Sequence, residues 1–408
     1  MAPWSAARAE EHLLGLELFG MRFGLGRMRR LLLALGSPQE AFGSVHVVGT
    51  NGKSSTTRMT AALLEAHGAR TGAFLSPHLT SFAERIRLGG ADLEPDAFGA
   101  AVGRAALAAE KVDRTLTDGE RVTQFELLTA AALSELAARG VDVAVIEAGL
   151  GGRHDATNVL PSSVQVLTNV GLEHTRWLGP TLADIAREKL AVVRPGATLV
   201  VGELEPEADA EVVETVERLA VRLVRVGAEA HFRRTNLAVA RAAAEAFRGE
   251  PLDPAIVEQV AAHLQVPGRF QRVGERPLTI LDGAHNPSGM QALAAALDDE
   301  VAERPLVAVF SVLDDKDAAG MLRALLPRCA ALLLTSSPHP RALPPATLGS
   351  LAAQVGWARE IVLEPDPRAA VARARELAGP AGAVVATGSI YLVADLLSAP
   401  GARRASAL

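Results

Sequence analysis

Residues 49–56, with the sequence GTNGKSST, combine glycines and side chains that can bind the phosphates of a nucleotide. Gly49 and Gly52 allow a sharp turn that points backbone N–H groups at an anion, and the helix expected to follow adds its positive end. Lys53 can reach the outer phosphates, and Ser54 offers a hydroxyl to Mg²⁺. A complete phosphate-loop pattern would have glycine two residues before Gly49, where this chain has valine, and a simple capped turn is the alternative. The flanking strand and helix favour nucleotide binding.

Polar side chains also follow the ends of three predicted strands. Ser76 comes directly after the apolar strand 71–75, Glu147 lies near the end of the strand VDVAVIEAG, and His174 lies just past the strand VQVLTNV. Because the carboxyl ends of parallel strands meet at one edge of a sheet, these three residues are candidate ligands for Mg²⁺ beside the phosphate loop. A Ser-Pro pair alone is simply a turn, and a lone histidine is usually structural, so Glu147 is the leading ligand.

Lysine is rare in this chain. Of 41 basic side chains only four are lysines, at positions 53, 111, 189 and 316. Arginine cannot replace lysine where a compact charge or a neutral amine is needed, so the remaining lysines are candidates for chemistry. Lys189 lies on a predicted helix beside Ala186, Leu190 and Val192, where loss of solvent favours the neutral amine. Such an amine can react with carbon dioxide.

The elements that position these residues follow from apolar periodicity and turn signals. Val45, Val47 and Val48 belong to a buried strand of a parallel sheet, and further strands follow at regular intervals. The predicted helices cover 54–68, 95–113, 123–139, 182–193 and a segment that begins at Asn236. This alternation predicts an α/β fold that begins with a P-loop ATPase-like domain containing a mostly parallel sheet.

Residues 267–276, with the sequence PGRFQRVGER, bring proline, glycine and charge together and are expected to link two domains. The ATP-binding domain would then cover residues 1–266, and a C-terminal domain would cover residues 277–408. In the second domain the strands LTILD, LVAVF, ALLLT, IVL and AVVAT alternate with helical stretches. This pattern predicts a smaller, Rossmann-like α/β domain, with Asp282 and His285 at the mouth of its first strand.

The composition narrows the possible partners. A chain of 408 residues, 49% of them hydrophobic, can form two cores, and a net charge of -6 gives no general attraction to nucleic acid or to an anionic membrane. Cys329 is the only cysteine, which excludes internal disulfides and cysteine-cluster metal sites. Charged residues near the N-terminus leave no apolar segment for a signal peptide or a membrane span. We expect a cytoplasmic, monomeric enzyme that binds small molecules.

Taken together, the motifs resemble folylpolyglutamate synthase / dihydrofolate synthase, a branch of the Mur ligase family of ATP-dependent amide-forming enzymes. The matching segments run through most of the chain in the order and rough spacing of that family. They are GTNGKSST, SPHLTSFAERIRLGG, TQFE, EAGLGGRHDATNV, GLEHTRWLGPTLADIAREK, PGRFQ, DGAHNPSG and SVLDDKD. So many ordered matches identify the family with high specificity.

The resemblance implies roles for particular residues. ATP phosphates would contact Thr50, Asn51, Gly52, Lys53, Ser54 and Ser55, and further nucleotide contacts would come from Asn236, Arg269 and Asp282. Two Mg²⁺ ions would have as ligands Ser76, Glu147, His174 and Lys189, with Lys189 present as a carboxylated lysine. The pterin substrate would occupy a pocket formed by Leu25, Gly26, Arg27, Thr123, Gln124, Phe125, Glu126, Arg153 and Asp155. The catalytic residues would be Lys53, Lys189 and His285, with His285 contacting phosphate or glutamate.

Four departures from the family pattern are visible. Ser54 replaces the usual glycine after the phosphate-loop lysine, and residues 190–192 read LAV where AGI is usual. Gln124 replaces an aromatic residue, and His154 replaces a leucine. The last two lie in segments assigned to the pterin pocket, so they bear on substrate selectivity.

The implied activity is the ATP-dependent ligation of L-glutamate to a folate or dihydropteroate carboxylate. The carboxylate would attack the γ-phosphate of ATP, and the amine of L-glutamate would then displace phosphate from the acyl phosphate. A Mur ligase acting on a UDP-sugar peptide would carry a domain of about a hundred residues ahead of the loop, whereas 48 residues precede Gly49. A non-catalytic ATP-binding switch would have no need of Glu147, His174 and Lys189 together. Whether the chain adds the first glutamate, extends folates, or does both stays open.

Overall fold

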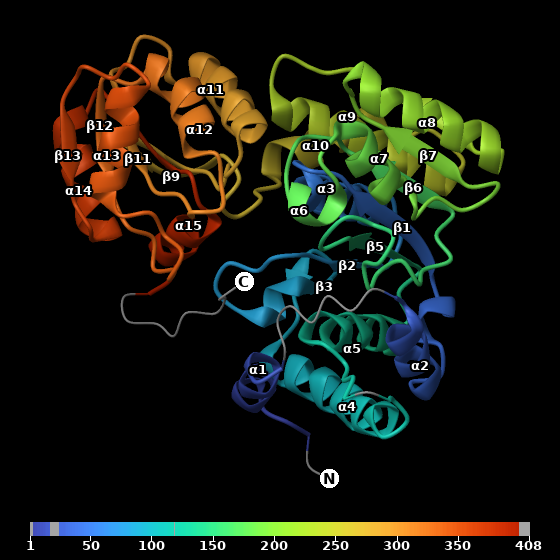
Figure 1. Ribbon diagram of the computed structural model, residues 1–408. Helices are drawn as coiled ribbons and strands as arrows, with labels where there is room; N and C mark the ends of the chain where they lie inside the picture. The colour runs from blue at the N-terminus through green and yellow to red at the C-terminus, as the bar shows by residue number, and fades with distance from the viewer. Residues whose placement is uncertain (1–2, 17–23, 118, 400–408) are drawn as a thin grey trace.

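The computed structural model describes residues 3–16, 24–117 and 119–399. Figure 1 shows two α/β domains side by side, with the C-terminal domain in orange and red. Each domain is built around its own sheet, one of eight strands and one of six. Within the described residues, no helix is long and apolar enough to cross a membrane. The expected α/β fold class, with an N-terminal P-loop ATPase-like domain and a smaller C-terminal one, is confirmed.

The N-terminal sheet contains β1 (Gly43–Val48), β2 (Thr71–Phe74), β3 (Ile86–Leu88), β4 (Ala91–Asp92), β5 (Val143–Glu147), β6 (Val164–Leu167), β7 (Thr198–Val201) and β8 (Arg222–Arg225). Their order in space is β4-β3-β2-β5-β1-β6-β7-β8. The six strands from β2 to β8 in this order run parallel, and β3 and β4 add an antiparallel edge. Because β5 lies between β1 and β2, Glu147 at its carboxyl end stands between the phosphate loop and Ser76.

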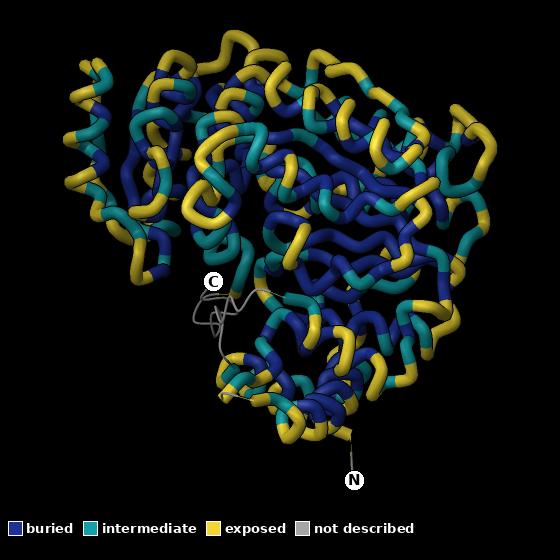
Figure 2. Tube along the Cα trace, turned by 45° about the vertical axis from the view of Figure 1, so that its right-hand side comes forward, coloured by how far each residue is buried: buried dark blue, intermediate teal, exposed yellow. Residues whose placement is uncertain are grey.

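Helices cover both faces of this sheet. One face packs against α3 (Lys53–Ala66), α9 (Phe232–Arg248) and α10 (Pro254–His263). The opposite face is covered by α1 (Ala6–Leu14), α2 (Gly26–Ala34), α4 (Pro95–Asp113), α5 (Gln124–Ala138), α7 (Leu182–Leu190) and α8 (Pro206–Leu219). The short helices η1 (Pro38–Glu40), η2 (Phe82–Arg85) and α6 (Thr175–Leu178) lie in connections between these elements. The result is a three-layer arrangement with the sheet in the middle, which Figure 2 shows as buried strands beneath partly exposed helices.

The C-terminal sheet contains β9 (Gln271–Glu275), β10 (Leu278–Leu281), β11 (Leu306–Phe310), β12 (Ala331–Leu334), β13 (Ile361–Leu363) and β14 (Ala383–Thr387). Its order is β13-β12-β11-β14-β10-β9, and only the edge strand β9 is antiparallel. One face packs against α11 (Pro287–Val301), α12 (Ala318–Leu325), η3 (Leu326–Arg328) and α13 (Pro345–Gln354), and the other against α14 (Pro367–Ala378) and α15 (Ile390–Leu397). All five strands predicted here from the sequence are present.

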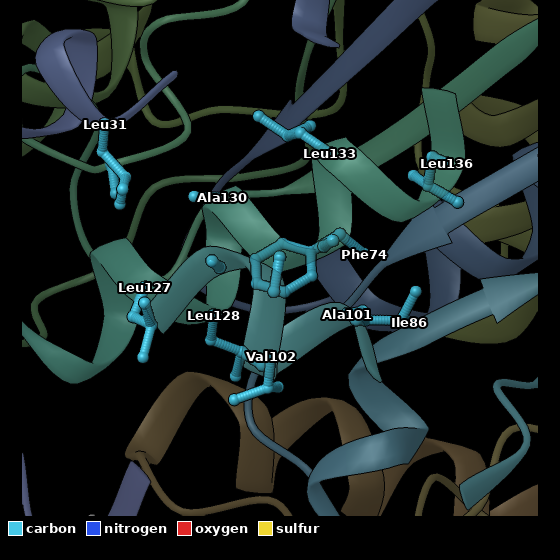
Figure 3. Packing of buried hydrophobic residues seen from close by; sticks show 14 of the residues in the cluster. Leu31, Phe74, Ile86, Ala101, Val102, Leu127, Leu128, Ala130, Leu133 and Leu136 are labelled. Atoms are coloured by element: carbon cyan, nitrogen blue, oxygen red, sulfur yellow. The ribbon is translucent and has the colours of Figure 1, made fainter. Parts of the chain in front are cut away.

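The largest hydrophobic cluster lies between α4, α5 and the sheet. Figure 3 shows Leu127, Leu128 and Ala130 of α5 close to Phe74 of β2. Helix α5 is apolar on nearly every side, which suits a helix enclosed between a sheet and another helix. Its start is fixed by a reciprocal cap in which the Thr123 hydroxyl accepts from the Glu126 amide and the Glu126 carboxylate accepts from the Thr123 amide. This packing holds the first turn of α5 in place beside the candidate site.

Two expectations about boundaries need correction. Helix α9 begins at Phe232, capped by the His231 ring that accepts from the Arg233 amide, so the prediction that the helix begins at Asn236 is wrong. Asn236 lies instead in the second turn. Residues 267–276 were expected to be a linker, but part of this segment forms β9, which pairs with β10. The second sheet therefore starts inside the segment.

Candidate functional site

The phosphate loop joins β1 to α3, and two of its residues must be glycine. Gly49 has φ +151, and a Cβ there would lie 1.8 Å from the Thr168 hydroxyl oxygen. Gly52 has φ +81, and a Cβ there would lie 2.6 Å from Oδ1 of Asn236. Both the backbone angle and the lack of space therefore exclude larger residues. Asn236 thus contacts the loop, although from within α9.

The loop is held from the side of β6. The Thr168 hydroxyl donates to the Asn51 carbonyl at 2.7 Å, and the Asn51 amide donates to Oδ1 of Asn169 at 2.8 Å. The Gly171 amide donates to the Thr50 hydroxyl at 3.0 Å. Lys53 Nζ donates to the carbonyls of Gly49 and Thr50, at 3.0 and 3.1 Å. These contacts fix the loop backbone around a cavity of about 270 Å³.

Glu147 contacts both the phosphate loop and the segment that follows β2. Its Oε1 accepts from the Ser54 hydroxyl at 2.9 Å, and its Oε2 accepts from the Ser76 amide at 3.1 Å. Burial raises the pKa of this carboxyl, although Lys53 and the two serine contacts oppose the rise. Glu147, Ser54, Ser76 and His174 all line the cavity around the loop.

Two further predicted site residues, His174 and Lys189, lie at the same cavity. His174 precedes α6 with φ 52, and burial lowers its pKa to about 4, so the imidazole is neutral near pH 7. Lys189 is buried in α7, and its Nζ donates to the Gly49 carbonyl at 2.9 Å. Burial, and then the nearby charge of Lys53, lower the pKa of Lys189 to about 7.

The donor set suits a Mg²⁺ ion that is held largely by nucleotide oxygens. No group of three or more His, Cys, Asp or Glu side chains with metal-binding geometry occurs among the described residues. Glu147 supplies a carboxylate and Ser54 supplies a hydroxyl, which are hard oxygen donors, and Ser76 lines the same cavity. Mg²⁺ in phosphoryl-transfer enzymes is commonly bound by one or two carboxylates, with substrate phosphates and water completing the shell.

The C-terminal domain closes the cavity through residues that sequence reasoning did not assign. Asn51 and Asn286 exchange side-chain hydrogen bonds at 3.2 and 3.0 Å, and Nδ2 of Asn51 also donates to the Ser288 hydroxyl at 3.0 Å. Asn286 and Ser288 belong to DGAHNPSG, so the motif was recognised while these two residues were not assigned. Contacts between loops of different domains have no sequence period that would have revealed them.

Glu173 is the centre of a second contact between the domains. Its Oε1 lies 3.0 Å from His285 Nε2 and accepts from Lys316 Nζ at 3.0 Å, and its Oε2 accepts from the Asn286 side chain at 3.2 Å. Burial alone would raise the pKa of Glu173, but His285 and Lys316 outweigh it and hold the pKa well below its usual value. Glu173 therefore remains an anion that joins both domains beside His174. The scarcity of lysine in the sequence could have identified Lys316 as a candidate site residue.

The remaining predicted nucleotide residues come from the start of the second domain. The Asp282 carboxylate accepts from the Phe270 and Ala284 amides at 2.7 and 2.8 Å, and burial raises its pKa. A Cβ on Gly283 would lie 2.7 Å from Nη1 of Arg269. Arg269, Asp282 and His285 all line the cavity around the phosphate loop.

A second cavity of about 440 Å³ adjoins the first and is lined by both domains. Arg27 Nε lies 3.2 Å from both carboxylate oxygens of Glu126, so two buried charges are paired at its wall. Gln124 donates its side-chain amide to the Leu13 carbonyl at 2.7 Å and thereby joins α5 to α1. From the predicted pterin set, the lining includes Arg27, Thr123, Gln124, Phe125, Glu126 and Asp155.

Three residues predicted for this pocket do not line it. Arg153 forms an ion pair with Glu188 at 2.7 Å and lines a different surface cavity beside Arg187. Leu25 and Gly26 are absent from the lining, although Gly24 and Arg27 on either side contribute to it. Arg153 stays next to the pocket in sequence but points elsewhere, because a loop has no regular side-chain period.

A phosphate loop beside a carboxylate, together with a second cavity closed by a Rossmann-like domain, defines a two-domain ATP-dependent ligase of the Mur type. Residues 47–272 match the Mur ligase middle domain, and residues 268–390 match the Mur ligase glutamate ligase domain. The chain belongs to the folylpolyglutamate synthase / dihydrofolate synthase family of these ligases.

Similarity to individual members extends over most of the chain. The chain is 36% identical to the dihydrofolate synthase/folylpolyglutamate synthase of Mycobacterium tuberculosis, over 78% of this chain and 75% of that protein. The folylpolyglutamate synthase of M. tuberculosis complexed with ADP superposes with a TM-score of 0.88 at 31% identity, covering 96% of this chain and 97% of the other. E. coli FolC in complex with DHPP and ADP gives a TM-score of 0.86 at 28% identity, covering 96% of this chain and 97% of the other.

A longer relative combines two activities in its name. The probable bifunctional folylpolyglutamate synthase/dihydropteroate synthase of Haloferax volcanii is 34% identical over 95% of this chain, which spans 49% of that protein. The similarity to this chain thus occupies about half of the bifunctional relative.

Proposed function

We propose that this protein uses ATP to ligate L-glutamate to the carboxylate of a folate or of dihydropteroate, through an acyl phosphate. The observation that carries the proposal is that the phosphate-loop cavity and the larger cavity share lining residues, among them Ser76, His174, Arg269 and His285. A nucleotide bound at the loop would therefore have its outer phosphate next to a site of suitable size for an acceptor. The family relationship supports the same reaction.

The charges around the larger cavity suit an acceptor with a heterocycle and a carboxylate. Basic side chains from both domains contribute to the lining, namely Arg85, Arg269, Lys316 and Arg341. Arg85 is fully buried, and its Nε donates to His78 Nδ1 at 2.8 Å. Cationic groups among and near the shared residues favour an acceptor carboxylate there, while Phe125, which lines the larger cavity and not the phosphate-loop cavity, offers an aromatic surface.

In the proposed reaction the acceptor carboxylate oxygen attacks the γ-phosphorus of ATP, and ADP leaves. Lys53 offsets negative charge on the phosphoryl group during this transfer, and the loop amides hold the neighbouring phosphates in line. The α-amine of L-glutamate then attacks the acyl carbon, phosphate leaves, and an amide is formed. His285, held by Glu173 at the junction of the two cavities, is placed to contact the phosphate or the incoming glutamate.

Two groups would complete this site. Mg²⁺, for which Glu147, Ser76, His174 and Ser54 are the proposed ligands, would neutralise phosphate charge during transfer. A carboxylated Lys189 would add an anionic oxygen ligand for a second ion. The buried position of Lys189 and the hard oxygen donors around Glu147 support this assignment.

The proposal is tested by measuring ADP release from the purified protein with L-glutamate and one acceptor at a time. Dihydropteroate and a reduced folate monoglutamate separate first-glutamate addition from extension. We expect ADP release to require both glutamate and an acceptor, and mass spectrometry to show one added glutamyl residue. ADP release that does not respond to either acceptor would contradict the proposed function, as would activity with a UDP-sugar peptide alone.

Replacing Glu147 by glutamine is expected to raise the Mg²⁺ concentration needed for half-maximal ADP release by about tenfold or more. The neutral amide keeps the shape of the side chain but removes an anionic oxygen. The matched control is Glu135→Gln, since Glu135 is a buried carboxylate that pairs with Arg104 and Arg139 away from the cavity. A Glu147→Gln enzyme with the Mg²⁺ dependence of the control would exclude Glu147 as a ligand.

A further inference from the structure

A chain of buried polar groups runs from the central strand of the N-terminal sheet to the wall of the larger cavity. His46 lies on β1 between Val45 and Val47, so its side chain points to the opposite face of the sheet from theirs. Its Nε2 lies 2.8 Å from the Thr157 hydroxyl oxygen, which in turn lies 2.5 Å from Oδ1 of Asp155. His46 and Thr157 are completely buried, while Asp155 reaches the cavity surface.

The direction of each hydrogen bond in this chain follows from its partners. Asp155 also accepts from the Thr157 amide at 3.0 Å and from the Leu150 amide at 2.8 Å, and a backbone amide can only donate. Burial raises the pKa of Asp155, and the hydrogen bonds from Thr157 and from the Leu150 and Gly149 amides oppose that rise. The ionised carboxylate can only accept, so in that state the single hydroxyl proton of Thr157 is donated to it. The hydroxyl oxygen must then accept from His46, which places the imidazole proton on Nε2.

The rest of the imidazole agrees with this assignment. His46 Nδ1 has no hydrogen-bond partner among the described residues, which suits a nitrogen that carries no proton. Burial, and then the charge of Arg194, lower the pKa of His46 to about 3, so the ring is neutral at physiological pH. Two aligned hydrogen bonds that end on a carboxylate polarise one another and strengthen both.

Asp155 closes the loop that forms one wall of the larger cavity. Its two oxygens tie residue 150 to residue 157, and this loop follows directly from β5. Arg194 holds the outgoing end by donating to the Asn158 carbonyl at 2.8 Å. None of His46, Thr157 and Asp155 lines the cavity around the phosphate loop. Asp155 itself lines only the larger cavity, whereas Leu150, whose amide it binds, lines both, so a change in this hydrogen-bond network alters a wall group of the acceptor cavity directly and reaches the nucleotide cavity only through Leu150.

We propose that His46 and Thr157 are positioning residues for the acceptor pocket, which hold the Asp155 carboxylate and its loop in the conformation that binds the acceptor. The inference rests on the proposed function, because it names residues that act on acceptor binding in that reaction.

The test compares Thr157→Val with Thr157→Ser in the ADP-release assay. Valine keeps the shape of threonine but cannot donate to Asp155, whereas serine retains the hydroxyl. We expect Thr157→Val to raise KM for the acceptor by about tenfold and to leave KM for ATP within about twofold. Thr157→Ser is expected to restore a KM for the acceptor close to that of the unaltered protein.

Thr129→Val is the matched control. Thr129 is equally buried, on α5, and its hydroxyl has no hydrogen-bond partner among the described residues. The same substitution at Thr129 removes a hydroxyl but leaves the hydrogen bonds from His46 to Thr157 and from Thr157 to Asp155 unchanged, so KM for the acceptor should not change. Two variants of His46 extend the comparison. His46→Gln keeps an N–H donor for Thr157, whereas His46→Leu has none, so only His46→Leu should raise KM for the acceptor.

The outcomes separate this inference from the proposed function. Equal rises in KM for ATP and for the acceptor, or a Thr157→Val enzyme that matches Thr129→Val, would overturn the positioning role while the reaction itself stands. An unaltered protein that uses neither acceptor would overturn the proposed function instead. If a His46 variant does not fold, the Thr157 comparison alone decides the inference.

Discussion

Replacing Lys53 by alanine is expected to abolish product formation and to leave the fold intact. Lys53 lies at the first position of α3, and its Nζ reaches back over the phosphate loop to the Gly49 and Thr50 carbonyls. A cation at this position acts on charge that moves during phosphoryl transfer, and removing one such group typically costs about 10²–10³ in rate. Alanine is a good helix former, so α3 should still begin normally.

The measurement is glutamate-dependent ADP release together with a thermal unfolding curve. Lys111→Ala is the matched control, because Lys111 is exposed in the last turn of α4, away from both cavities. The control should retain normal activity, and both variants should unfold close to the temperature of the unaltered protein. A Lys53→Ala enzyme with activity within about twofold of the control would contradict the assignment of the nucleotide site.

The phosphate loop and the strand ends are predictable from the sequence because their determinants are local. An apolar run makes β1, two glycines permit the turn, and the periodicity of residues 54–68 makes α3. The position of Glu147 beside the loop follows from a general property of parallel sheets, in which the carboxyl ends of strands meet at one edge. That β5 lies between β1 and β2 is not local, and it places Glu147 between Ser54 and Ser76.

Contacts between the domains are not predictable in this way. Glu173 is bound by His285 and Lys316, which lie more than a hundred residues along the chain, and only the packing of the two domains brings them together. Loop residues pose a similar difficulty. Arg153 and Asp155 are two residues apart, yet one pairs with Glu188 and the other reaches the acceptor cavity. A loop lacks the regular period that assigns side chains of a helix or a strand to a face.

The proposed carboxylation of Lys189 would account for an arrangement that an ordinary lysine does not. An ordinary lysine at this position would need a carboxylate as partner, and the adjacent Glu188 binds Arg153 at 2.7 Å instead. Within the described residues Lys189 forms no ion pair, and the only hydrogen bond of its side chain is to the Gly49 carbonyl. A buried ammonium without a counter-ion is costly, whereas a neutral amine can take up carbon dioxide and become an anion beside the proposed metal site.

Lys189→Arg is therefore expected to be nearly inactive, since arginine keeps the positive charge and cannot form the carbamate. Lys189→Ala should be inactive alone and partly rescued by acetate or formate, which supply the missing carboxylate, but not by the neutral acetamide. Incubation of the unaltered protein with ¹³C-bicarbonate should give a carbamate signal in the NMR spectrum that is absent from Lys189→Arg. Lys111→Arg controls for the substitution itself, because no chemistry is assigned to Lys111. Full activity of Lys189→Arg would exclude the carbamate, because arginine would then suffice for whatever the lysine does.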